Sequence, residues 1–150
     1  RRNPRSHRTV IGPTKNSAWR GTCRLKRNRE LYGTDNIPFS AAMPSDSLLF
    51  VSGQGGFNPD DRDAELGGIE IQTERTVENI RKILAQWGLT LADVLKVNVF
   101  LTDRKHYETF NQVYSRLFPQ PYPARTLVYC ELNFGLLVEI DVIARRRQER

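Results

Sequence analysis

Hydrophobic positions along the chain change their spacing from segment to segment, and each spacing predicts an element. The apolar run at residues 47–53 ends in glycine, which is typical of a buried strand, and turn-forming residues follow it at 54–61. From Thr73 to Trp87 the apolar residues recur every three or four positions, which predicts one buried face of a helix. Gly88 is a natural residue to end that helix.

The next segments predict a strand and a second helix. β-Branched residues predict the strand over residues 94–102. Strict alternation places four apolar side chains on one face of this strand: Leu95, Val97, Val99 and Leu101. An apolar stripe over residues 107–117 then predicts a helix that ends before Pro119.

Two more strands complete the pattern, at about residues 124–132 and 136–144, joined by a hairpin-like link at Asn133–Gly135. Right-handed strand–helix–strand connections would place both helices on one face of a mixed sheet, in an α+β fold. The other face of the sheet still carries apolar residues, and no segment remains to cover it. We therefore expect the protein to form an oligomer.

Charge divides the chain into two parts. The net charge is +6, but residues 1–29 contain ten basic residues and no acidic one. Residues 30–150 therefore hold 13 of the 23 basic residues and all 17 acidic ones, a net charge of −4. Residues 1–35 are predicted to form a basic arm with too little apolar surface to fold, and 36–147 one domain.

The arm limits the predictions about partners and location. Nucleic acid is expected to bind only through residues 1–29, if it binds at all. No apolar run is long enough to suggest a membrane span. The arm is rich in arginine and free of acids, which suits an organellar transit peptide, although it lacks a clear amphipathic helix. A charged tail without a specific role is the simpler alternative. We expect a cytoplasmic protein, or a mitochondrial or plastid one if the arm is such a peptide.

The cysteines and histidines are too scattered to predict a disulfide framework or a metal site. Cys23 lies in the arm and Cys130 in a predicted strand, while His7 and His106 are equally isolated. We expect a reducing compartment and no bound metal.

Two charged residues have the chemistry of a reactive site. Arg125 opens a predicted strand after a proline-rich loop, where its planar guanidinium can bind a carboxylate. The more common alternative is a surface arginine or one in an internal ion pair. Glu139 lies between Val138 and Ile140, and burial there would raise its pKa and suit it to proton transfer. The more common alternative is a solvent-facing residue beside Asp141.

Two further features suit ligand binding less specifically. Backbone amides at Gly53–Gly56 can approach a ligand closely, although no Lys-Ser or Lys-Thr follows to make a phosphate loop. A plain turn is the favoured alternative on chemistry alone. Asn111, beside Phe110, can form a hydrogen bond to a ligand or a partner subunit, or simply border the helix.

Together these segments resemble the RidA/YjgF family, also described as L-PSP endoribonuclease-like, over about Asn36 to Arg147. The resemblance lies in the order and spacing of eight segments: Ile37–Ser40, Val51–Gln54, Gln72-Thr73, Glu78–Ile80, Val94–Asp103, Phe110–Tyr114, Tyr122–Thr126 and Val138–Ala144. It implies a chorismate-mutase-like fold and a homotrimer, in which three sheets form a central barrel and active sites lie between subunits. Family members hydrolyse 2-aminoacrylate and related 2-imino acids to 2-keto acids and ammonia, without metal or organic cofactor.

The resemblance also implies roles for individual residues. Arg125 matches the arginine that clamps the substrate carboxylate, and Glu139 matches the acidic residue that orients or activates water. Four further residues are expected to bind the substrate through backbone groups or at family cleft positions: Phe39, Gly53, Asn111 and Leu127.

The sequence departs from the family pattern at several of these positions. Phe39 replaces the usual tyrosine, Leu127 the usual cysteine, and Leu132–Phe134 the usual Leu-Pro-Lys. Gly53–Gly56 replaces Gly-Gln-Ile-Pro. The substrate therefore stays open, and two alternatives to an imine deaminase remain. One is a ligand-binding trimer without catalysis, and the other is an RNA-binding or RNA-cleaving protein that uses the basic arm.

Overall fold

The computed structural model describes residues 37–58, 60–61 and 63–146, so the predicted arm at 1–35 lies outside the described residues. Five strands and two α-helices follow one another in the described part: β1 (Ala42–Pro44), β2 (Leu48–Gly55), α2 (Ile69–Ala85), β3 (Val94–Leu101), α3 (Tyr107–Leu117), β4 (Ala124–Tyr129) and β5 (Val138–Arg145). Two short 3₁₀ turns precede β3 and α3: Leu91–Asp93 and Arg104–His106.

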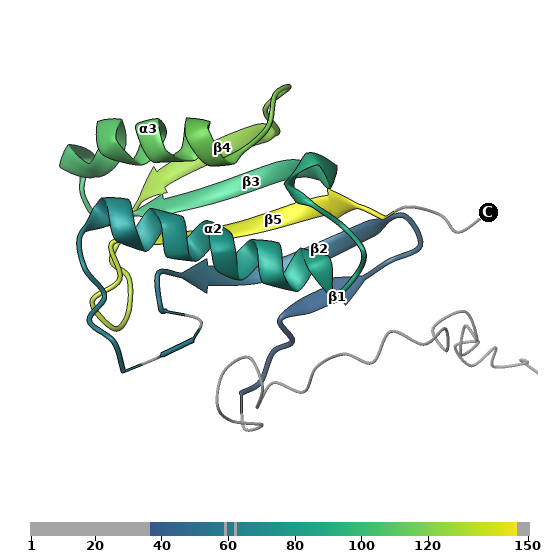
Figure 1. The fold of residues 1–150 in the computed structure, drawn as a ribbon, viewed down its shortest axis with the longest axis horizontal. Coiled ribbons are helices and arrows are strands. Elements are labelled where there is room, and N and C mark those ends of the chain that lie inside the picture. The colour runs from purple at the N-terminus through teal and green to yellow at the C-terminus, as the bar shows by residue number, and fades with distance from the viewer. Residues whose placement is uncertain (1–36, 59, 62, 147–150) are drawn as a thin grey trace, which may run out of the picture.

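The strands form one mixed sheet in the order β1-β2-β5-β3-β4. β5 is antiparallel to both β2 and β3, whereas β4 runs parallel to β3 at the edge of the sheet. Both helices lie on the same face of this sheet, with α3 over the β4 side and α2 across the middle (Figure 1). This arrangement confirms the expected α+β fold with a mixed sheet and two helices on one face.

The prediction of a hairpin-like link between the last two strands is wrong. β4 and β5 do not pair, because β3 lies between them. The link passes the end of β3, where Cys130 N donates to Leu101 O at 3.0 Å and Thr102 N donates to Leu137 O at 3.1 Å. A short link is compatible with a hairpin and with a step across one strand, so its length could not distinguish the two.

The predicted position of Leu95 on the buried face of β3 is also wrong, since Leu95 is exposed. The register of β3 against β5 shifts between Val94 and Lys96. This irregularity moves Val94 onto the buried face in place of Leu95, and the alternation is regular from Lys96 onward.

Smaller differences concern the ends of elements. α2 begins at Ile69, before the first residue of the predicted stripe, and Trp87 lies in the turn after the helix. Gly88 has a φ of 67°, as expected of a glycine that ends a helix. The short strand β1 has only three residues and was not predicted as a separate element.

The hydrophobic core lies between the sheet and the two helices. Every second side chain of β5 points into it, and all four are almost completely buried: Val138, Ile140, Val142 and Ala144. α2 contributes Val77, Ile80 and Leu84, and α3 contributes Phe110. The alternation along β5 and the three- or four-residue spacing along the helices place these side chains in one layer.

The opposite face of the sheet, which we call the open face, has no covering element among the described residues. Met43 and Phe50, paired across β1 and β2, are 49% and 44% exposed, and Val128 of β4 is exposed as well. This confirms the expectation that the helices leave an apolar sheet surface uncovered. Among the described residues, no helix combines the length and apolar character needed to cross a bilayer.

We expect Ile140→Ala to lower the free energy of unfolding by about 2–5 kcal/mol, because it removes a fully buried side chain from the central strand. Chemical denaturation followed by circular dichroism measures this loss. Ile71→Ala, which shortens an exposed side chain on α2, is the matched control and should change stability by less than about 0.5 kcal/mol. Equal losses in the two variants would contradict the assignment of β5 to the core.

Candidate functional site

Arg125 is held against α3 by two aromatic rings and one hydrogen bond. Its guanidinium carbon lies 4.9 Å from the ring centre of Tyr114 and 5.7 Å from that of Phe110. Nη1 donates a hydrogen bond to Oδ1 of Asn111 at 2.9 Å. The side chain therefore lies on the helix face of β4, where it is half-buried.

No carboxylate forms an ion pair with Arg125 among the described residues, whereas Arg116 on α3 pairs with Glu70 and Glu74. The described residues therefore do not support the alternative that Arg125 forms an internal ion pair. A half-buried guanidinium that uses one of its five N–H groups on Asn111 has others available for a planar anion. A carboxylate suits the remaining N–H groups of Arg125 best, because it can accept two parallel hydrogen bonds.

Tyr114, which faces Arg125, lies at the centre of an aromatic cluster. Its ring stacks on Phe118 with the ring centres 4.3 Å apart and the planes at 19°, and Tyr122 lies 6.4 Å away. The residue is only 5% exposed, and its hydroxyl has no hydrogen-bond partner among the described residues. Burial raises the pKa of Tyr114 to about 12, against the opposing effect of the nearby Arg125 charge, so the hydroxyl stays protonated at neutral pH.

Leu127 follows Arg125 by two residues on β4 and packs, half-buried, against the core. Because side chains alternate along a strand, Arg125 and Leu127 share the helix face. The structure thus brings together three of the predicted site residues, which we call the arginine half: Asn111, Arg125 and Leu127.

Gly53 lies directly beneath the carboxyl group of Glu139. The register of β2 against β5 shifts between Val51 and Gln54, which marks a β-bulge at this point. A β-carbon at Gly53 would overlap Oε1 of Glu139, so only glycine allows this approach. Bulges often occur beside active sites because they redirect side chains and backbone groups.

Glu139 is half-buried on the open face, and its carboxyl group forms no hydrogen bond or ion pair with the other described residues. Burial raises the pKa of its carboxyl group, and repulsion from Asp141 raises it further. Asp141 itself accepts a hydrogen bond from Asn98 at 2.8 Å. The two carboxylates share a face, as the alternative predicted, but Glu139 is left with the perturbed pKa of a candidate proton carrier.

Phe39 lies close to the bulge in the chain that precedes β1. The neighbouring carbonyl groups of Ser40 and Ala41 accept hydrogen bonds from Ser52, from its hydroxyl at 2.6 Å and from its N–H at 2.9 Å. The structure therefore brings together a second group of predicted residues, which we call the glutamate half: Phe39, Gly53 and Glu139.

The two halves do not meet within one chain. Arg125 projects to the helix face of the sheet, whereas Glu139 projects to the open face. Arg125 and Glu139 are three residues apart along the strands and two strand spacings apart across the sheet. Each of these two separations amounts to roughly 10 Å. A substrate that contacts both side chains would need one half from each of two copies.

Two polar side chains of α2, which the sequence did not mark as functional, support the glutamate half. Gln72 is buried, donates to Gly67 O at 2.9 Å and accepts from Leu137 N at 2.8 Å. Asn79 donates to the carbonyl oxygens of Gly55 and Phe57, both at 3.0 Å. The signal in the sequence was weak, since each is a polar residue at the edge of an apolar helix stripe.

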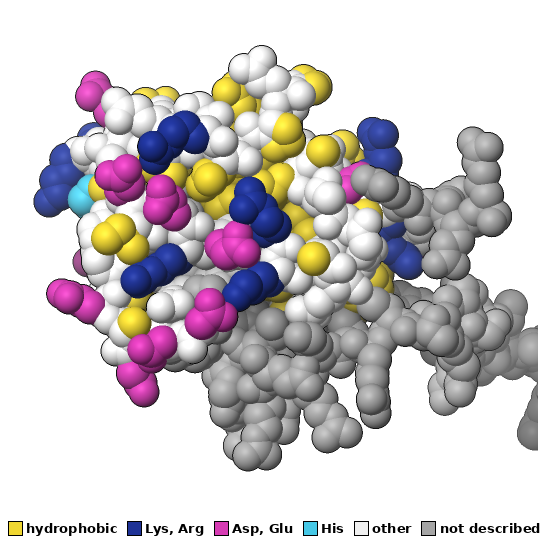
Figure 2. Space-filling view, viewed as in Figure 1, with side chains coloured by type: hydrophobic (Ala, Val, Ile, Leu, Met, Phe, Trp, Pro, Cys, Tyr) yellow, Lys and Arg dark blue, Asp and Glu magenta, His cyan; other side chains and the backbone are white. Residues whose placement is uncertain are grey.

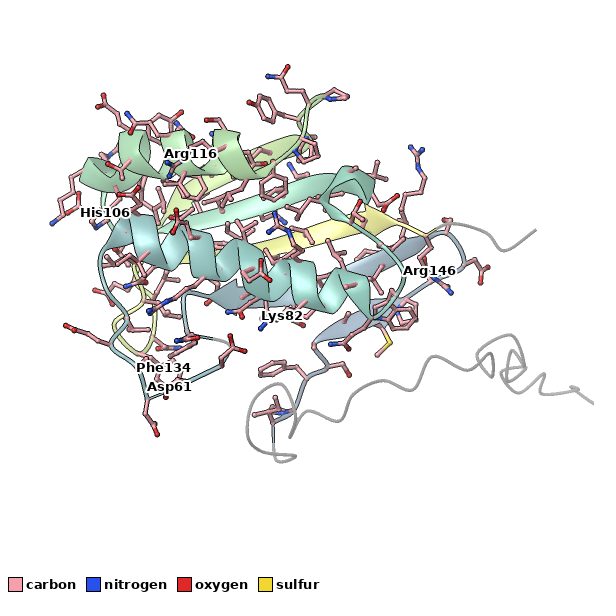
Figure 3. The ribbon with its side chains drawn as sticks, in the orientation of Figure 1. Asp61, Lys82, His106, Arg116, Phe134 and Arg146 are labelled. Atoms are coloured by element: carbon pink, nitrogen blue, oxygen red, sulfur yellow. The ribbon has the colours of Figure 1, made fainter. Side chains whose placement is uncertain are left out.

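Phe134, one of the departures from the family pattern, is 79% exposed and adopts a φ of 61°. Its ring lies 6.2 Å from that of Phe57, and Figure 3 places it at the same corner of the molecule as Asp61. The same view shows His106 at the start of α3. Among the described residues, no three His, Cys, Asp or Glu side chains gather as ligands for a metal ion.

Comparisons with known proteins agree on one family. The family profile described as Endoribonuclease L-PSP matches residues 34–146. The mitochondrial protein MMF1 of Saccharomyces cerevisiae is 36% identical over 107 residues, which cover 71% of this chain and 73% of that protein. The structure of RidA from an Antarctic Psychrobacter is 34% identical with a TM-score of 0.69, covering 75% of this chain and 91% of the other.

A further similar structure holds a small ligand. TdcF of E. coli, solved with bound serine, is 30% identical with a TM-score of 0.70, and the match covers 74% of this chain and 90% of that one. The share of each relative that is covered means that the match extends over most of the domain rather than over one motif.

We expect Glu139→Gln to be more stable than the wild type at neutral pH. Because the pKa of Glu139 in the folded state is above the ordinary value of 4.5, the fold holds this proton more tightly than the unfolded chain does. Both states are protonated below pH 4.5. The unpaired charge lowers stability as the pH rises through 4.5 and then through the raised pKa.

Thermal melts of both proteins between about pH 4 and pH 8 measure the effect, and the gain should vanish at the acid end. Glu131→Gln, which removes an exposed carboxylate after β4, serves as the control for a simple change in net charge. A wild type as stable as Glu139→Gln at neutral pH would contradict the description of Glu139 as an unpaired, half-buried acid.

Proposed function

The chain belongs to the endoribonuclease L-PSP family, also called RidA/YjgF, and we propose that it hydrolyses reactive enamines and imines of 2-amino acids to 2-keto acids and ammonia. The observation that supports this most is Arg125, a half-buried cation with no acidic partner among the described residues. The carboxylate of a 2-imino acid is the planar anion that such a guanidinium recognises.

Glu139 supplies the second chemical group. An enamine first takes a proton on carbon and loses one from nitrogen to become an imine, which water then attacks at the carbon of the C=N bond. Glu139 would accept a proton from that water and return it to the nitrogen, which gives an aminoalcohol. The hydroxyl proton of the aminoalcohol would then pass to the nitrogen as the C=O bond forms and the C–N bond breaks, which releases the keto acid and ammonia. Burial raises the pKa of the Glu139 carboxyl group, which makes the carboxylate a better proton acceptor than an ordinary exposed one. The substrate is already reactive, so positioning and proton transfer suffice.

The assembly that we propose is a homotrimer with active sites between subunits. The open face is apolar and uncovered by the described residues, and β4 lies at the sheet edge. The arginine half and the glutamate half lie on opposite faces, so a site that contains both requires two copies. Packing the open faces of three copies around one axis would meet both requirements.

The remaining predicted site residues would line the cleft. Gly53 brings backbone groups close to Glu139, and Asn111 holds Arg125. Phe39 and Leu127 present apolar surface where the family usually has a hydroxyl and a thiol. We propose small 2-imino acids as the substrate class, with 2-aminoacrylate as the first to test. The serine bound in the similar TdcF structure is also a small molecule with a carboxylate next to a nitrogen-bearing carbon.

The proposed location is the cytoplasm, or the mitochondrion or plastid if residues 1–35 act as a transit peptide. The excess of basic residues at 1–29 suits such a peptide. The yeast relative MMF1 is named as mitochondrial, which favours the organellar alternative.

We expect the wild type to release ammonia and keto acid from freshly generated 2-aminoacrylate, and Arg125→Ala to lower kcat/KM at least about 100-fold, since two charge-assisted hydrogen bonds are lost. Arg116→Ala, on the exposed side of α3, is the control and should keep full activity. A panel of imino acids with side chains of increasing size then identifies the preferred substrate.

Tight binding of keto acids without turnover of any imino acid would favour the alternative of a ligand-binding trimer. A wild type that accelerates no member of the panel and binds no keto acid would refute the proposal.

The family description names an endoribonuclease, so RNA cleavage is the second candidate function. On the face shown in Figure 2, acidic and basic side chains of the described residues are mixed over the helices, and no basic stripe crosses them. We expect RNA to bind only through residues 1–29, with an affinity that falls steeply as salt increases. Filter binding with and without these residues measures this. Binding or cleavage of RNA by the shortened protein would favour the second candidate instead.

A further inference from the structure

Arg125 needs to be ordered before a carboxylate arrives if it is to bind both oxygens at once. Arginine has several freely rotating bonds, and freezing them on binding weakens the affinity. β4 is an edge strand, so the backbone that bears Arg125 is fixed on one side only, by β3. One hydrogen bond to Asn111 defines the position of Nη1 but leaves the guanidinium plane free to turn about it.

The face of the Tyr114 ring supplies the missing constraint. The guanidinium carbon lies 4.9 Å from its centre, closer than the 5.7 Å that separates it from the centre of Phe110. A cation over an aromatic face is attracted by the negative charge of the π-system, and the attraction strengthens where water is excluded. Tyr114 is almost completely buried, so this contact is made in such surroundings.

Three neighbouring aromatic rings fix the Tyr114 ring, so this ring can in turn fix the position of the Arg125 guanidinium. It stacks on Phe118 beyond the end of α3, tilts against Phe110 with ring centres 5.6 Å apart, and lies beside Tyr122. Tyr122 stands in the proline-rich loop that leads directly into β4. The same ring therefore contacts the helix, the loop and the arginine side chain that follows the loop.

The hydroxyl group of Tyr114 is not what fixes Arg125. It is buried and has no hydrogen-bond partner among the described residues, and the only hydrogen bond of Arg125 to a side chain goes, in that part of the chain, to Asn111. The contact between the two residues is made by the ring face. A phenylalanine at this position would keep that contact.

The geometry points to Tyr114 as a positioning residue, whose ring holds the Arg125 guanidinium in the orientation that binds the carboxylate of 2-imino and 2-keto acids. This inference rests on the proposed function and adds a residue that sets the affinity of the site. The expected signature is a rise in KM and in the dissociation constant of a keto acid, with kcat little changed, because the ring does not touch the reacting carbon.

The test measures binding of 2-oxobutanoate, an unreactive product-like keto acid, to the full chain by titration calorimetry. Tyr114→Leu and Tyr114→Met remove the ring face and should weaken binding about 10-fold, the size expected for one cation–π contact away from water. Tyr114→Phe keeps the ring and should bind within about two-fold of the wild type. Val113→Ala, equally buried on the same helix, is the control for a general loss of stability.

A double-variant comparison separates positioning from packing. In an Arg125→Lys background, where no guanidinium plane has to be oriented, Tyr114→Leu should weaken binding much less than it does in the wild type. Full additivity of the two changes would overturn the inference, as would equal binding by wild type and Tyr114→Leu. So would a loss in Tyr114→Phe or Val113→Ala as large as that in Tyr114→Leu.

The outcome for the wild type distinguishes the two proposals. A wild type that neither binds 2-oxobutanoate nor turns over 2-aminoacrylate refutes the proposed function, and the inference with it. A wild type that does both, while Tyr114→Leu and Tyr114→Met match its affinity, refutes the inference alone.

Discussion

The sheet depends on β5, because the last strand of the chain lies at its centre. β5 pairs with β2 on one side and with β3 on the other, and its inward side chains are almost completely buried. The strands that carry the two halves of the site can therefore be joined into one sheet only after β5 has been synthesised. Glu139 lies on this strand itself, and Arg125 lies two strands away on β4. One pairing pattern thus determines both the core and the separation of the reactive groups.

Around Glu139 the fold combines close backbone contact with side-chain amides that hold the neighbouring loops. The bulge in β2 brings Gly53 under the carboxyl group, while Gln72 and Asn79 bind loop carbonyl and amide groups on either side. The carboxylate itself is left without a partner, although its pKa is raised by burial. A half-buried acid without a partner beside well-bonded neighbours is a candidate functional group, which agrees with the role that we propose for Glu139.

The sequence predicted the elements with strong periodicity but not their neighbours in space. The stripes of α2 and α3 and the alternation of β5 depend on local burial, which residue spacing records. The pairing of β5 between β2 and β3, and the irregularity that exposes Leu95, depend on contacts between distant segments. Arg125 and Glu139 were found through their chemistry and the family resemblance. Tyr114 lies within the predicted apolar stripe at 107–117, but periodicity cannot distinguish a ring that packs from one that also orients a cation.

The placement of the two halves on opposite faces has a consequence for inheritance. In the proposed trimer every chain contributes Arg125 to one active site and Glu139 to another. An allele damaged at Arg125 and an allele damaged at Glu139 would each abolish activity alone. Expressed together, they would form mixed rings in which some sites receive both intact groups. Two recessive defects within one gene would then complement each other, as though they lay in different genes.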